Sequence, residues 1–223
     1  MAEALAIVGG LAAVTQLAGM AWRLGQDLSR LAANVWTTSD EIKIFADQLK
    51  TSSTVIRLSQ CTIVNFCEDS PESGVVKHIK SRQLLEKIDT TARRVLRHLR
   101  QAYHKVRGMR KSSSLVITLT WFWRKASILE FYPAVECVKT NLGLLISSVL
   151  MEEVRSKLVR GLPVKNEQID LLQQVISDQL RTIEDLRSQV RRLSRRTRAT
   201  ESLFIALSEQ DPFLDLGRSM YKA

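Results

Sequence analysis

The stretch ALAIVGGLAAVTQLAGMAW, from Ala4 to Trp22, contains no charged residue, in a chain of 223 residues that carries 33 Lys and Arg and 23 Asp and Glu. A stretch of this kind is typical of a secretory signal, of a membrane-spanning helix, or of a core helix rich in small residues. The choice among these three interpretations decides whether the chain folds in water or in a membrane.

The flanks and the composition of this stretch favour a core helix. Glu3 stands where a signal sequence carries basic residues, and the apolar pattern continues to Ala33 without a cleavage site. Much of the stretch is Ala or Gly, which gain little from lipid but let neighbouring helices approach closely. We therefore expect the central helix of a bundle, from about residue 2 to residue 33. The positions expected to make these close contacts, or to enter a membrane if the helix were released, are Ala6, Gly9, Gly10, Ala13 and Leu17.

The rest of the composition predicts a helical protein without a covalent framework. The chain has only nine Gly and four Pro, so it must run in long elements, and long elements are helices. The three cysteines, Cys61, Cys67 and Cys137, are odd in number and form no CxxC pair, which disfavours disulfides and a zinc knuckle. We expect three buried thiols in a cytoplasmic protein.

Apolar residues at helical spacing predict three further long helices. The second helix begins at a capping box, Thr38 to Glu41, and ends near Phe66. The third runs from about Val76 to Val106, and the fourth from Leu115 to about Arg160. LVITLTWFW, at the start of the fourth, alternates β-branched and aromatic residues as a strand does, but a lone strand would have no partner, so we predict a helix there.

The cleanest periodicity in the chain follows the Gly-Pro break at 161–166. Four heptads with Gln179 as one polar member predict a coiled coil, which either pairs with a second copy as a parallel dimer or folds back onto the bundle. Gln179 is expected to set the register. The apolar seam consists of Ile169, Leu172, Ile176, Ile183, Leu186, Val190 and Leu193.

Together these patterns predict an all-α chain. We expect an up-and-down bundle of about four long helices in residues 1–160, a linker at 161–166, a coiled coil at 167–198 and a flexible tail at 199–223.

The predicted third helix carries a basic face opposite its apolar face. Such a face either keeps the bundle soluble or binds an anionic partner, and a membrane surface suits it better than nucleic acid, because Tyr103 is the one aromatic residue there. Its members are Arg93, Arg94, Arg97, Arg100 and Arg107.

The sequence contains no catalytic signature. Phosphate-binding loops, zinc-protease motifs and serine-hydrolase motifs are absent, and the three histidines lie in the basic region without a carboxylate three or four residues on. We expect no enzyme, no metal or other cofactor and no small-molecule substrate. The expected partner is a protein or a second copy bound through the coiled coil, with an anionic membrane surface as the alternative.

Three segments resemble the fungal N-terminal domain of STAND-type proteins, often described as HeLo-like and also named for the azaphilone pigments biosynthesis cluster protein L. The resemblance covers roughly residues 1–160. It is carried by MAEALAIVGGLAAVTQLAGMAWRL, by SDEIKIFADQLKTSSTVIRLS and by WFWRKASILEFYPAVECVKTNLGLLISSV.

The resemblance implies an all-α regulatory or signalling domain that acts through protein contacts. It leaves two alternatives open: a membrane-perturbing effector that releases its first helix, and an accessory protein of a pigment gene cluster without a catalytic step. The chain lacks the nucleotide-binding loop of larger family members, so we expect no nucleotide-driven switch.

Overall fold

The computed structural model describes residues 11–35, 39–109, 112–129, 131–163 and 166–194, and every regular element in these ranges is a helix. The helices are α2 (Ala12–Ala32), α3 (Ser39–Asp69), α4 (Gly74–Ser81), α5 (Leu84–Met109), α6 (Ser114–Leu129), α7 (Tyr132–Val159) and α8 (Asn166–Ser194). The all-α prediction is confirmed, and so is the helical assignment of LVITLTWFW, which lies within α6.

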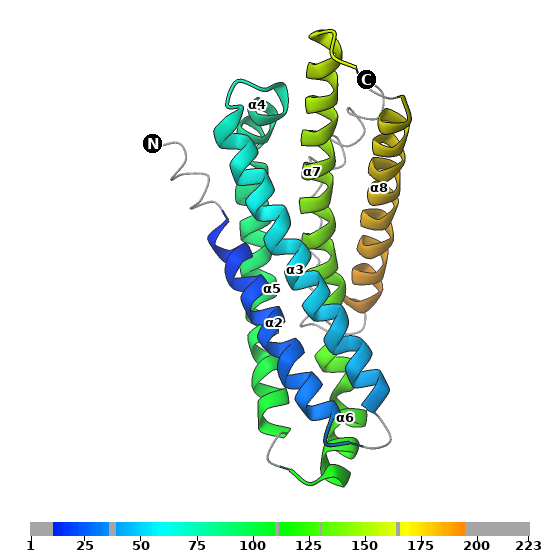
Figure 1. Cartoon of the computed structure of the whole chain (residues 1–223). Coiled ribbons are helices and arrows are strands. Elements are labelled where there is room, and N and C mark those ends of the chain that lie inside the picture. The colour runs from blue at the N-terminus through cyan, green and yellow to red at the C-terminus, as the bar shows by residue number, and fades with distance from the viewer. Residues whose placement is uncertain (1–10, 36–38, 110–111, 130, 164–165, 195–223) are drawn as a thin grey trace.

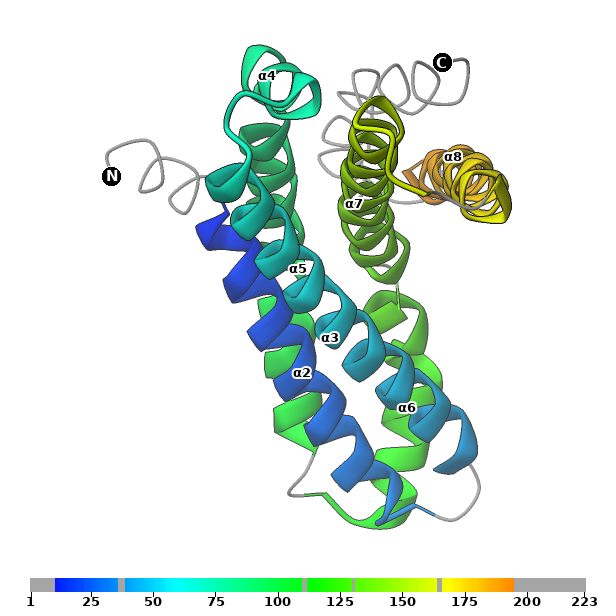
Figure 2. The same cartoon turned by 45° about the horizontal axis from the view of Figure 1, so that its top comes forward.

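The core of the bundle lies between α2, α3, α5 and α7 (Figure 1). α2 packs against α3 and α5, and these two helices both contact α7. α8 lies alongside α7 on its outer side, while α6 lies at the lower end of the bundle, below α7 (Figure 2).

α7 shares the interior of the bundle with α2, the helix that the sequence predicts to be central. α7 contacts α3, α4, α5 and α8, and its buried residues, from Ala134 to Met151, cover most of its circumference. Among the described helices α7 alone is long and apolar enough to cross a membrane, but 72% of its most apolar window is buried inside the chain. Burial of this kind is typical of a core helix whose apolar residues cover most of its circumference.

Two predicted helices are broken in the structure. The predicted third helix is α4 followed by α5, because Gln83 adopts a left-handed conformation with φ of 52°. The predicted fourth helix is α6 followed by α7, with Phe131 as N-cap and Pro133 in the first turn of α7. Proline has no N–H to donate and clashes with the carbonyl group of a preceding turn, so it favours the start of a new helix.

The thiols differ from the prediction at one position. Cys67 and Cys137 are buried, and burial raises the pKa of the Cys67 thiol. Cys61, in contrast, is exposed on α3, so the expectation that all three thiols are buried is wrong.

Small residues bring α2 and α3 close together. Gly25 lies so near α3 that a Cβ atom on it would approach the Ala46 carbonyl oxygen to 2.9 Å. About two turns away, Ser53 Oγ donates a hydrogen bond of 2.7 Å to the carbonyl of Ala18. Of the predicted close-contact positions, Ala13 and Leu17 are buried in this region, whereas Ala6, Gly9 and Gly10 lie outside the described residues.

The start of α2 is held by a carboxylate from another helix. Asp89 of α5 is buried, and its Oδ1 accepts a hydrogen bond of 2.6 Å from the backbone N–H of Ala13. Its Oδ2 accepts a second bond, of 2.8 Å, from Arg93 Nε. A carboxylate at this position satisfies an orphan N–H group and interacts favourably with the helix dipole.

We predict opposite effects for two glycines of α2. Gly25→Ala should lower the free energy of unfolding by about 1–3 kcal/mol, because the new Cβ overpacks the contact with α3. Gly19→Ala is the matched control: a Cβ there meets nothing within 4 Å. It should instead raise stability by up to about 1 kcal/mol through helix propensity. Urea unfolding of both variants measures this, and equal stability of the two would contradict the close approach.

Candidate interaction surfaces

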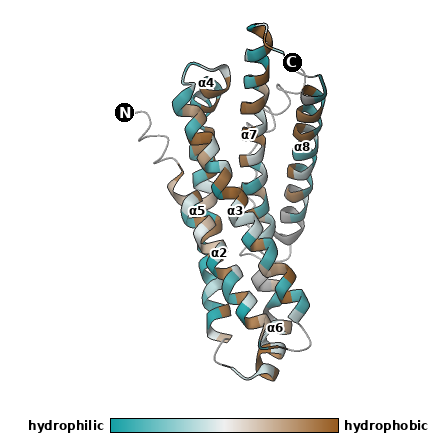
Figure 3. Cartoon of the chain, in the orientation of Figure 1, coloured by the Kyte–Doolittle hydropathy of each residue, from teal (hydrophilic) through white to brown (hydrophobic). Residues whose placement is uncertain are grey.

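α6 presents its most apolar face to solvent. Ile117 and Trp121, one turn apart, point into the core and are each 1% exposed. The opposite face carries five large apolar side chains, and Phe122 and Trp123 are 76% and 83% exposed. Figure 3 shows hydrophobic residues gathered on α6 at the lower end of the bundle. We call this face the α6 surface; it consists of Leu115, Val116, Leu119, Phe122 and Trp123.

A polar contact with α3 positions α6. Glu41, in the first turn of α3, accepts a hydrogen bond of 3.4 Å from Trp121 Nε1 and forms an ion pair with Lys125. The hydrogen bond from Lys125 lowers the pKa of the Glu41 carboxyl, outweighing the effect of desolvation. The carboxylate assigned to a capping box therefore binds α6, and Thr38, the other member of that box, lies outside the described residues.

The predicted basic face of α5 is only partly available. Arg93 is paired with the buried Asp89, and Arg94 is half-buried. Arg100 is exposed and donates a hydrogen bond of 3.3 Å to the neutral side chain of Gln16. Arg97 and Arg107 are also exposed, on the same side of the helix. Three of the five predicted arginines therefore present exposed charge without a carboxylate bonded to them among the described residues.

The heptad seam of α8 packs within the chain. Ile176, Ile183 and Leu186 are buried against the bundle, and Ile169 and Leu172 are half-buried. α8 and α7 pack side by side, so the fold-back arrangement, which the sequence left open beside dimerisation, is present in the structure. Val190 and Leu193 belong to α8, but their side chains are outside the described set.

Gln179 sets how α8 sits on α7. Its Oε1 accepts a hydrogen bond of 3.1 Å from Ser147 Oγ of α7. The amide fits because residue 143 is glycine: a Cβ there would lie 3.0 Å from Gln179 Nε2. The structure thus places Gln179 in a contact with α7, and its register role remains a prediction.

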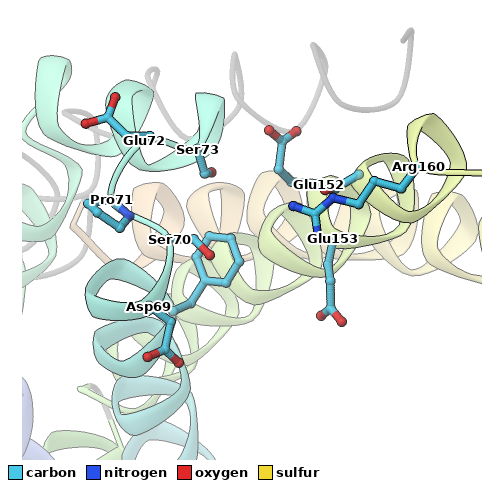
Figure 4. A pocket seen from close by; sticks show the side chains of 10 residues that line it. Asp69, Ser70, Pro71, Glu72, Ser73, Glu152, Glu153 and Arg160 are labelled. Atoms are coloured by element: carbon cyan, nitrogen blue, oxygen red, sulfur yellow. The ribbon is translucent and has the colours of Figure 1, made fainter.

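A hollow of about 430 Å³ lies between the α3–α4 loop and the end of α7 (Figure 4). Its wall includes four carboxylates, and those of Glu72, Glu152 and Glu153 already bond to protein groups: Lys77 Nζ, the Gly74 N–H and Lys157 Nζ. Within the described part of the chain no three His, Cys, Asp or Glu side chains are grouped to hold a metal ion. Of these contacts, the hydrogen bond from the Gly74 N–H to Glu152 joins the start of α4 to α7.

No family model, curated protein or solved structure matches the chain. The class that the described residues define is a helical bundle in which α6 turns an apolar face outward.

The contact between Glu41 and Lys125 predicts a pH-dependent attachment of α6. Because the folded-state pKa of Glu41 lies below its ordinary value of 4.5, the pair stabilises the fold above pH 4.5 and loses this contribution as the pH falls through the lowered value. Glu41→Gln should be less stable than the wild type at pH 7, by at most about 1 kcal/mol for a pair this exposed. The difference should vanish in acid. Lys125→Gln is the control: in urea unfolding the double variant should lose no more than either single variant.

Gly143 and Gln179 should be strongly coupled. Gly143→Ala should destabilise the chain because its Cβ displaces the Gln179 amide from Ser147. In a Gln179→Ala background the same substitution meets open space and should stabilise by up to about 1 kcal/mol. A double-mutant cycle in urea should give a coupling of about 0.5–3 kcal/mol, whereas additive effects would show that Gln179 does not set the packing of α8.

Proposed function

We propose that this chain is a non-enzymatic interaction protein whose helical bundle binds its partner through the α6 surface. One observation carries the proposal: five large apolar side chains are exposed together on one face of a helix. Soluble proteins expose such side chains singly, and a contiguous apolar patch is typical of an interaction site.

The architecture supports a scaffold role. We regard the chain as an up-and-down bundle extended by a coiled-coil-type helix, as the resemblance to the HeLo-like fungal domain implies, and as a cytoplasmic regulatory protein. The pigment-cluster role of that family remains a prediction from the resemblance, since no feature of the described residues bears on a metabolite.

Self-association through the heptads of α8 is a second proposal with a physical cost. Ile176 and Ile183 are already covered by the bundle, so a dimer through this seam requires α8 to leave α7. Exchange of α8 between two copies meets that requirement, because each α7 then receives the helix of the other copy. Light scattering of the intact chain gives its mass, and a monomer at all concentrations would reject self-association.

The interaction role can be tested by photo-crosslinking, which needs no knowledge of the partner. A benzoylphenylalanine at position 122 replaces an exposed ring with a photoreactive one of similar shape. In irradiated cells it should form adducts in several-fold higher yield than the same probe at position 171, where Leu171 is 62% exposed on α8. Equal yields at the two positions would reject the α6 surface as an interaction site.

A further inference from the structure

This inference rests on the proposed function and names the partner: we propose that the α6 surface binds the interfacial region of an anionic lipid membrane. The exposed arginines of α5 contact the headgroups beside it. α6 lies flat in the interface and does not cross the bilayer.

The distribution of charge favours an anionic partner. Residues 90–129, which form most of α5 and all of α6, hold ten of the 33 Lys and Arg and none of the 23 Asp and Glu. The other residues are therefore balanced in charge, and the segment 90–129 carries a charge of +10, equal to the net charge of the chain. Because α5 and α6 are neighbouring helices, much of this positive charge lies next to the apolar face of α6.

Exposed charge in this region is available to a partner. Asp89 and Glu41 pair with Arg93 and Lys125, but no ion pair of the described residues involves Arg97, Arg100 or Arg107. Cations near an anionic leaflet are attracted to it over a distance of about a Debye length, roughly 8–10 Å in physiological salt. In the proposed arrangement, the exposed arginines of α5 lie within this range of the headgroups when α6 lies in the interface.

The composition of the α6 surface suits a bilayer interface. Tryptophan and other aromatic side chains are enriched at the level of the headgroups, and Trp123, Leu115 and Phe122 are the three most exposed members of the α6 surface. The uncharged run 112–123 is about 18 Å long as a helix, too short for a hydrocarbon core of about 30 Å. It is flanked by Arg110-Lys111 and Arg124-Lys125 in the sequence, as expected for a helix that lies in the interface plane.

A second copy of the chain suits the α6 surface less well. Joining two α6 surfaces would bring two regions of strong positive charge together, and like charges across an interface oppose association. α6 is also a single convex helix, around which lipid can deform. Membrane binding does not require α6 to detach from the bundle. Ile117, Trp121 and the contact with Glu41 keep α6 attached while its outer face inserts.

Vesicle co-sedimentation of the full chain tests the proposal. The wild type should bind vesicles of phosphatidylcholine with phosphatidylserine, bind phosphatidylcholine alone far more weakly, and lose affinity as salt is added. Phe122→Ser/Trp123→Ser should weaken binding by at least about tenfold, since two exposed aromatic side chains no longer enter lipid. Arg97→Gln/Arg100→Gln should weaken binding to the anionic vesicles by about tenfold or more.

Val159→Ser/Leu171→Ser is the matched control, because it removes two exposed apolar side chains from α7 and α8 and should leave binding unchanged. Unaltered circular dichroism and melting temperature of each variant show that the fold is retained. Absence of binding by the wild type would overturn the proposal, as would equal binding by the Phe122→Ser/Trp123→Ser variant.

The photo-crosslinking separates this inference from the proposed function. Lipid adducts at position 122 support both. Protein adducts alone keep the interaction role and reject the membrane as its partner, and a mass equal to two chains identifies self-association. Yields equal to those at position 171 reject both.

Discussion

The burial of α7 is the constraint on which the rest of the structure depends. Apolar residues cover most of the circumference of α7, and such a helix is kept from water only where other helices cover it, as α3, α4, α5 and α8 do. Two of its hydroxyl groups bond back to their own helix: Thr140 and Ser148 each donate to the carbonyl four residues earlier. In this way α7 presents apolar surface to four neighbours without leaving these hydroxyls unsatisfied.

The break before α7 accounts for the exposed apolar face of α6. α6 and α7 follow one another, but α8 packs on α7 and α6 is held by α5 and by Glu41 of α3. The apolar pattern continues through both helices, while the covering helix lies along only one of them. The outward side of α6 thus stays in water with the composition of a buried surface.

Periodicity predicted the kinds of element well because it reports which side of a helix is apolar. It predicted α3, α5, α6 and the seam of α8, and the seam residue Ile183 is fully buried. It did not predict the break at Gln83, because a left-handed conformation without Gly leaves no signature in composition. Pro133 was a visible signal for the second break, but the apolar spacing continued past it and concealed the end of α6.

The α6 surface was harder to predict than the fold, because the exposure of a side chain depends on which elements pack against it and not on the residue type. Leu119 of α6 and Leu145 of α7 are the same side chain in two helices, yet one is 62% exposed and the other fully buried. The same reasoning applies to α8. Its heptads predict a partner helix but do not indicate whether that helix belongs to the same chain or to a second copy. In the structure α7 is the partner helix of α8. In the described part of the chain, the main apolar helix face left without a partner is then that of α6. The α6 surface lies next to α5, and the segment 90–129, which includes α6 and most of α5, carries a charge of +10. An apolar face beside positive charge is what an anionic lipid interface requires.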